Sequence, residues 1–225
     1  MNYQHYKPKN LEEIKKKAIT FSKFRNRCKE YLIRNNVKFD KFTIVGHDSE
    51  IGYISERTLK SYLESNYSDV KICSWENKCD IKRIFRILDN NLTDQESVRI
   101  VSEYFYDKYD LVLSYNNKSI YIDVKTAKTK KEPTSNWKFL YPEIQTTKIG
   151  KDYIALIYCI YDDNNNNIKD TVIIGAIKHS DIKNYNLVEK GSINRNGAPS
   201  QTKNYETDLN DYCSIDDLIN ILKQS

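Results

Sequence analysis

The chain has 225 residues, of which 39% are hydrophobic and 12% are aromatic. This length and composition allow a packed core and exclude a disordered chain. The net charge is +5, from 36 basic and 31 acidic residues, so a basic surface for a polyanion would depend on local clustering. We expect a single domain over residues 1–225.

Cysteine usage and the first residues indicate the compartment. Cys28, Cys73, Cys79, Cys159 and Cys213 contain no CxxC pair, which favours reduced thiols over a disulfide or zinc framework. The opening MNYQHYKPKN has no apolar signal core, and no stretch reaches the length of a membrane-spanning helix. We therefore expect a soluble intracellular protein.

Apolar residues at helical spacing predict two long helices near the start of the chain. They recur through residues 11–35, where Asn10 is the candidate N-cap. A second helix is predicted over residues 49–65, in which Glu56 and two leucines fall on one side at steps of three and four. Glu56 is therefore expected to face the same way as these leucines.

Shorter helices are predicted further on. Residues 80–88 have a helical pattern, and Ser214 and Asp217 are placed to cap a closing helix. Thr93 and Glu96 match a capping box, although the residues after them alternate well enough to form a strand. Helix and strand both remain open at that point.

The middle of the chain predicts β-structure. Residues 109–115 and 119–125 form two β runs joined by Asn116-Asn117-Lys118, which is a hairpin signal. The nearly continuous apolar runs 152–161 and 171–178 predict strands in the centre of a sheet that is covered on both faces. Together these elements predict an α/β (mixed α+β) fold in which helices flank a central mixed β-sheet.

Three charged residues gather at one end of the predicted hairpin. Asp110 begins its first strand and Asp123 lies near the end of its second, so antiparallel pairing lets the two carboxylates approach. Alternation along a strand puts Asp123 and Lys125 on the same face. Two close carboxylates repel each other and are costly to bury, and Mg²⁺ relieves both costs. The hairpin therefore predicts a magnesium site.

The same residues predict phosphodiester chemistry. Magnesium joins substrate phosphates and lowers the pKa of a bound water. Lys125 can hold that nucleophile or the phosphate as negative charge develops. Glu56 can add a ligand through water. The alternative for the Asp-x-Lys pair is a weak surface ion pair on an exposed strand.

The pattern resembles the PD-(D/E)xK nuclease superfamily, and within it the type II restriction endonucleases. The likeness consists of Asp110, a twelve-residue gap and "IDVK", preceded by a helix that carries "GYISE". Tyr109 stands where the motif has proline. The resemblance covers residues 49–180 as a catalytic core, and residues 181–225 would supply a DNA-recognition loop and the closing helix.

This resemblance implies a restriction-endonuclease-like core that hydrolyses double-stranded DNA with one or two Mg²⁺ ions per active site. It implies metal ligation by Asp110, Asp123 and Val124, and catalysis by Asp110, Asp123, Lys125 and Glu56. It further implies a homodimer in the cytoplasm of a bacterium or archaeon, with a cognate DNA methyltransferase in the same system. A repair or recombination nuclease, such as a Holliday junction resolvase, and a non-catalytic DNA-binding domain are the alternatives.

Two polar segments are candidates for contact with DNA: the residues after Lys125, and residues 192–205. Lysine neutralises phosphates, whereas arginine, asparagine and glutamine can make bidentate contacts with bases. The alternatives are a solvated basic turn and a surface loop without a binding role. The candidate DNA-binding residues are Thr126, Lys128, Lys130, Lys131, Asn136, Asn194, Arg195, Asn196, Gln201, Lys203 and Asn204.

Overall fold

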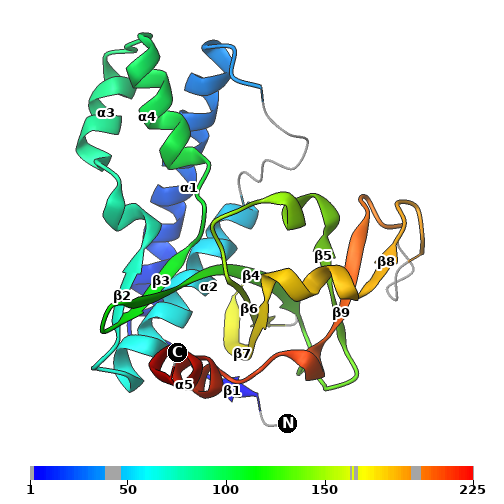
Figure 1. Cartoon of the computed structure of the whole chain (residues 1–225). Helices are drawn as coiled ribbons and strands as arrows, with labels where there is room; N and C mark the ends of the chain where they lie inside the picture. The colour runs from blue at the N-terminus through cyan, green and yellow to red at the C-terminus, as the bar shows by residue number, and fades with distance from the viewer. Residues whose placement is uncertain (1–2, 39–46, 163, 165–166, 194–198, 225) are drawn as a thin grey trace.

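The computed structural model describes residues 3–224 except for 39–46, 163, 165–166 and 194–198. The α-helices of this part are α1 (Leu11–Arg34), α2 (His47–Asn66), α3 (Ile81–Asp89), α4 (Gln95–Phe105) and α5 (Ile215–Gln224) (Figure 1). The strands are β1 (Gln4–His5), β2 (Lys71–Ser74), β3 (Leu111–Tyr115), β4 (Lys118–Thr129), β5 (Lys138–Pro142), β6 (Tyr153–Tyr161), β7 (Ile168–Lys178), β8 (Asn186–Val188) and β9 (Asn204–Asp208). Short 3-10 helices are η1 (Trp75–Lys78), η2 (Glu143–Thr147), η3 (His179–Asn184) and η4 (Leu209–Asp211).

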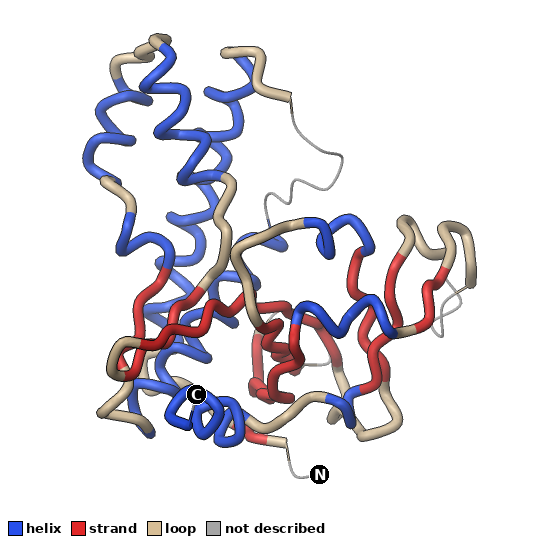
Figure 2. The backbone as a smooth tube through the Cα atoms, viewed as in Figure 1, coloured by secondary structure: helices blue, strands red, loops and turns tan. Residues whose placement is uncertain are grey.

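A six-stranded mixed sheet forms the frame of the molecule. Its strand order is β1-β7-β6-β4-β3-β2, in which β4 and β6 run parallel and the other neighbours run antiparallel. A separate three-stranded antiparallel sheet has the order β5-β9-β8. Figure 2 shows the strands of the large sheet among the surrounding helices. The predicted central mixed sheet flanked by helices is confirmed, and so is the interior position of β6 and β7.

The large sheet is covered on both faces because side chains alternate along its apolar strands. On one face, Ala155 and Ile157 of β6 pack in a cluster that contains leucines of α2 and α5. On the other face, Ile154 and Leu156 pack in a cluster with Tyr141 of β5 and the residues around η4. The small sheet therefore takes the place that a second layer of helices would fill.

Helix α1 packs through two different halves. Leu11, Ile14 and Ala18 of its first half join residues of α2 and of strands β6 and β7. Its second half, through Phe24 and Tyr31, packs with α3 and α4, which stand beside it away from the large sheet in Figure 1. Every predicted helix is thus present. The segment around Thr93 and Glu96 is helical, as α4.

Some expectations were wrong in detail. The N-cap of α4 is Asp94, whose carboxylate accepts a hydrogen bond of 2.9 Å from the Ser97 backbone N–H, and not Thr93. Strands β1, β2, β5, β8 and β9 were not predicted, because short strands lack the long apolar alternation that identifies longer ones. The capping box of Ser214 and Asp217 at α5 is confirmed by hydrogen bonds of 2.7–3.3 Å.

Cysteine state and helix hydropathy can be stated for the described residues. The five cysteines are free thiols. Within the described residues, no helix combines the length and the apolar character needed to cross a membrane.

Gly175 lies in β7 where the chain leading to α5 crosses the sheet. Its φ is 141°, and a Cβ at this position would collide with the carbonyl oxygen of Cys213. Ala176 and Cys213 exchange two backbone hydrogen bonds of 2.9 Å at the crossing. Gly175→Ala is therefore expected to lower the free energy of unfolding by more than about 1 kcal/mol, as measured by urea denaturation.

Gly52→Ala is the matched control, since Gly52 lies in α2 with no atom within 4 Å of an added Cβ. This change is expected to be neutral or stabilising because alanine favours helix. Equal stability of Gly175→Ala and the wild-type protein would contradict the close approach of the two chain segments.

Candidate active site

A cavity of about 460 Å³ contains all four predicted catalytic residues. Glu56 reaches it from α2, and Asp110 from the position directly before β3. Asp123 and Lys125 reach it from β4. The fold thus brings to one cavity side chains that are 69 positions apart in the chain, from residue 56 to residue 125.

The hairpin pairing places Asp110 against β4. The Asp110 backbone N–H donates to the Ile122 carbonyl at 2.8 Å, and Leu111 pairs with Ile122. The Asp110 carboxylate turns back over β4, where its Oδ2 accepts a hydrogen bond of 2.5 Å from the Val124 backbone N–H. Burial and the negative charge of Asp123 raise the pKa of Asp110 to about 7. Both carboxylates line one cavity, and the charge of Asp123 acts on Asp110.

Asp123 lies between two lysines. Its Oδ2 is 2.8 Å from Lys125 Nζ and 2.9 Å from Lys151 Nζ. Burial by itself raises the pKa of Asp123, but the two ammonium groups outweigh burial and lower it to about 2. Asp123 is consequently ionised in the folded protein. The 2.8 Å ion pair with Lys125 also confirms that both side chains lie on the same face of β4.

Lys125 keeps its proton despite its surroundings. Burial lowers the pKa of its ammonium group, whereas the charges of Asp123 and Asp110 raise it by more, so the net shift is upward. The ammonium also lies 6.0 Å from the centre of the Tyr141 ring. A fixed positive charge thus stands beside both carboxylates.

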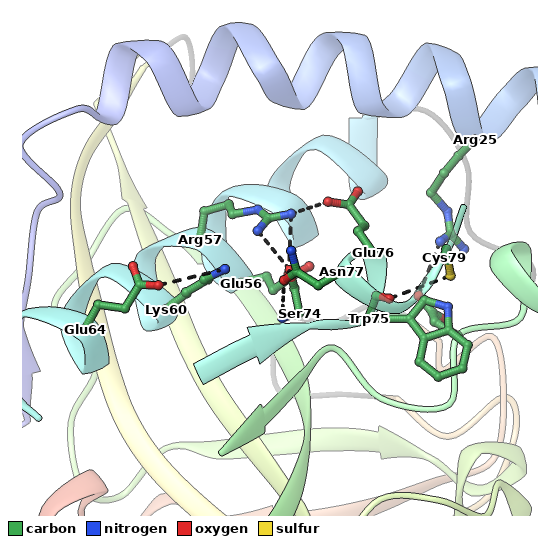
Figure 3. A network of polar contacts seen from close by, with 11 residues as sticks. Arg25, Glu56, Arg57, Lys60, Glu64, Ser74, Trp75, Glu76, Asn77 and Cys79 are labelled. Carbon is green, nitrogen blue, oxygen red and sulfur yellow. Dashed lines mark hydrogen bonds and ion pairs between the residues drawn. The ribbon is translucent and has the colours of Figure 1, made fainter. Parts of the chain in front are cut away.

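Glu56 has a buried oxygen that lacks a hydrogen bond. Within the described part of the chain its Oε1 has no hydrogen-bond partner, and Arg57 Nη2 is 3.8 Å away, which is too far for one. The guanidinium of Arg57 bonds instead to Glu76 and to Ser74 Oγ (Figure 3). Burial raises the pKa of Glu56 well above its ordinary value, and the charge of Asp110 adds to that rise although Arg57 opposes it.

Val124, which the family resemblance implies as a metal ligand, has its side chain in the core with residues of α2. Only its main chain can therefore face the cavity, and its N–H is bonded to Asp110. Asp110 lies electrostatically between Glu56 and Asp123, because its charge raises the pKa of Glu56 and the charge of Asp123 raises the pKa of Asp110.

Two further cavity residues were not predicted. Gln145 lies on η2 and is buried, and its Oε1 has no hydrogen-bond partner among the described residues. Lys151 lies two positions before the start of β6, and its side chain is only 2% exposed. The only sequence signal was a lysine just before a continuously apolar run. Lysines at such positions are usually exposed, so this pattern does not predict a buried charge.

The first predicted DNA-binding segment divides between the faces of β4. Thr126 does not fit a DNA contact, because strand alternation turns it away from Lys125 and its Oγ1 is buried. Lys128 lies 3.6 Å from Asp48 of α2. The exposed residues that remain as candidates beyond β4 are Lys130, Lys131 and Asn136.

The second predicted segment lies partly outside the described residues, since these do not include Asn194, Arg195 and Asn196. Asn204 does not fit base recognition, because it is buried and its amide donates to Ser200 and Thr202 at 2.7 and 2.8 Å. Gln201 and Lys203 are exposed. Lys203 forms an ion pair of 3.0 Å with Glu189.

The donor set fits a magnesium ion better than a closed metal cage. The described residues include no group of three or more His, Cys, Asp and Glu side chains that could hold a metal by themselves. Magnesium, however, usually takes one or two carboxylates and completes its shell with waters and phosphate oxygens. Asp110, Asp123 and the unpaired oxygen of Glu56 supply hard oxygen ligands whose mutual repulsion a cation would relieve.

Comparison of the chain with protein-family models, with curated proteins and with solved structures finds no significant match. The resemblance to PD-(D/E)xK nucleases therefore depends on the residues of this cavity alone.

The raised pKa of Asp110 predicts that stability falls with rising pH in the absence of metal. Its pKa of about 7 in the folded protein lies above its ordinary value, so folding binds a proton between these two pH values. That contribution is complete below the ordinary pKa and is lost as the pH rises through about 7. In EDTA, the midpoint of thermal unfolding is expected to fall by at least roughly 3 °C between pH 5.5 and pH 8.

Asp110→Asn removes the carboxyl group that binds this proton, and it is expected to make the midpoint of thermal unfolding less dependent on pH. Asp107→Asn is the matched control, because Asp107 lines the same cavity but forms an ion pair of 3.2 Å with Arg25. The control should keep most of the dependence. Identical pH profiles for Asp110→Asn and the wild type would show that Asp110 ionises normally.

Proposed function

We propose that the protein is a Mg²⁺-dependent, site-specific endonuclease that cleaves double-stranded DNA, of the type II restriction kind. The observation that carries the proposal is the arrangement of Asp110, Asp123 and Lys125 in one cavity, where the buried Asp123 and the half-buried Asp110 lie beside the half-buried ammonium group of Lys125. A surface ion pair, the alternative interpretation of Asp-x-Lys, does not account for their burial. Such an enzyme would act in the cytoplasm as a homodimer, one active site for each DNA strand.

The residues of the cavity have separate tasks in this proposal. Asp110 and Asp123 would hold the magnesium ion, and Glu56 would add its unpaired oxygen directly or through water. When bound, the ion would supply Lewis-acid chemistry at the phosphate and lower the pKa of a water. The carboxylates must be ionised to do this, and a cation would favour the ionised form of Asp110, whose pKa burial and Asp123 otherwise raise.

Lys125 would stabilise the negative charge that develops on the phosphate during hydrolysis. Its ammonium is fixed by Asp123 at 2.8 Å and stays protonated because Asp123 and Asp110 raise its pKa. A charge that is already fixed in position needs no reorganisation as the reaction proceeds, which is the basis of electrostatic catalysis. The exposed lysines beyond β4, Lys130 and Lys131, would contact the DNA backbone.

The first test is cleavage of plasmid DNA by the purified protein in Mg²⁺. Discrete fragments are expected from the wild type, and none from Asp123→Asn or Asp110→Asn, because each change removes a metal-binding charge. Circular dichroism should show both variants folded. Cleavage of branched but not linear DNA would instead identify a structure-reading resolvase, and undiminished cleavage by both variants would refute the assigned site.

The second test is Lys125→Met, which keeps most of the side-chain packing and removes the charge. The single-turnover cleavage rate in Mg²⁺ is expected to fall on the order of a hundredfold or more, as for other fixed electrostatic groups. DNA binding in Ca²⁺ should persist, since most phosphate contacts would lie elsewhere. Lys118→Met, an exposed position at the far end of β4, is the matched control and should cleave normally. A normal cleavage rate for Lys125→Met would refute a catalytic role for Lys125 and leave "IDVK" as a strand segment with an ion pair.

A further inference from the structure

Lys151 is a buried cation in the wall of the cavity. Its side chain is 2% exposed, and its ammonium lies 2.9 Å from Asp123 Oδ2. Lysine is seldom buried unless it is paired, because taking its charge out of water is costly. The burial of the Lys151 ammonium therefore depends on its ion pair with Asp123. The same carboxylate also pairs with Lys125 of β4.

The chain around Lys151 is held tightly to β4. Gly150 has a φ of 94°, a backbone conformation that favours glycine, and turns the loop close to Lys108. Asp152 is fixed twice to Tyr121 of β4: its N–H donates to the Tyr121 carbonyl at 2.8 Å, and its Oδ2 accepts from the Tyr121 N–H at 2.9 Å. The sequence Gly150-Lys151-Asp152 thus directs the lysine at Asp123, two residues along the strand from Tyr121.

Both lysines point at one oxygen. Lys125 Nζ and Lys151 Nζ lie 2.8 and 2.9 Å from the same Asp123 Oδ2. A divalent cation bound by that oxygen would face two ammonium groups at short range, and like charges so close repel strongly where water is scarce. One ammonium must move away when the ion binds. The charge of Asp110 acts on both lysines, but Lys125 stands on a regular strand whereas Lys151 lies in the connection before β6. Lys151 is therefore the ammonium expected to move.

We infer that Lys151 is a second functional lysine of the active site, which occupies the metal-binding oxygen of Asp123 in the metal-free protein and passes to the scissile phosphate of DNA when the ion binds. This inference rests on the proposed nuclease function. In this inference, the negative phosphate of the DNA substrate replaces Asp123 as the anion that pairs with Lys151. Metal and DNA should consequently bind with positive cooperativity. The DNA phosphate draws the Lys151 ammonium away from Asp123, which removes the repulsion between that ammonium and the ion. The bound ion in turn releases the ammonium for the phosphate.

The test measures metal binding without DNA, by titration calorimetry with Mg²⁺. Lys151→Met is expected to bind Mg²⁺ at least about fivefold more tightly than the wild type, because the competing charge is gone. Its single-turnover cleavage rate should nevertheless fall on the order of a hundredfold, because the phosphate loses a positive contact. Tighter metal binding with slower cleavage is a combination that simple loss of structure does not produce.

Lys148→Met is the matched control, since Lys148 lines the same cavity from the same loop but is exposed. Its Mg²⁺ affinity without DNA should stay within about twofold of the wild type, as expected for a screened surface charge. If Lys151→Met does not fold, Lys151→Gln removes the charge while keeping a hydrogen-bond donor for Asp123. Thermal unfolding in EDTA verifies the fold of each variant.

The outcomes separate this inference from the proposed function. Unchanged or weaker Mg²⁺ binding by the neutral variants, or no Mg²⁺ binding by any form, would overturn the role of Lys151. Wild-type cleavage of DNA together with unaltered cleavage by Lys151→Met would also overturn it and leave the nuclease proposal intact. A wild type that cuts no DNA, with Lys151→Met still binding Mg²⁺ more tightly, would refute the nuclease while supporting the competition at Asp123.

Discussion

The pairing of β3 with β4 is the constraint on which the site depends. A two-residue turn, with Asn116 in the left-handed region at a φ of 52°, fixes the register of the hairpin. That register sets Leu111 opposite Ile122 and so brings the carboxylate of Asp110 over Val124. A slip of one residue would turn Asp123 and Lys125 into the core and bring Val124 out. The apolar face of β4, packed on α2, makes such a slip costly.

The cavity holds several ionisable groups whose burial does not favour stability. Burial acts against the ionised form of three of its carboxylates, those of Glu56, Asp110 and Asp123, and of two of its lysines, Lys125 and Lys151. The pairs around Asp123 offset that cost, but Glu56 and Asp110 are left with raised pKa values. Perturbed groups of this kind gather at functional sites, where stability is given up for a reactive arrangement. Gly175, in contrast, serves only the packing of the fold.

Most of the large sheet could be predicted from sequence, because β6 and β7 are continuous apolar runs and the β3–β4 hairpin alternates around a turn signal. The expectation that Asp110 and Asp123 lie near each other followed from that hairpin alone. The small sheet could not be predicted, since β8 and β9 carry few buried apolar residues. Lys151 and Gln145 were missed for another reason: their burial arises from contacts between distant segments, and a single lysine or glutamine in a loop has no sequence signal of burial.

The parallel pairing of β4 with β6 explains how those missed residues reach the cavity. Parallel neighbours cannot be joined by a tight turn and need a crossover of a dozen or more residues. Here the crossover runs from the end of β4 to Asp152 and contains β5 and η2. It therefore carries Tyr141 to the face of Lys125, Gln145 to the cavity wall and Lys151 to Asp123. The connection that a parallel strand requires thus also builds the half of the site that faces the hairpin.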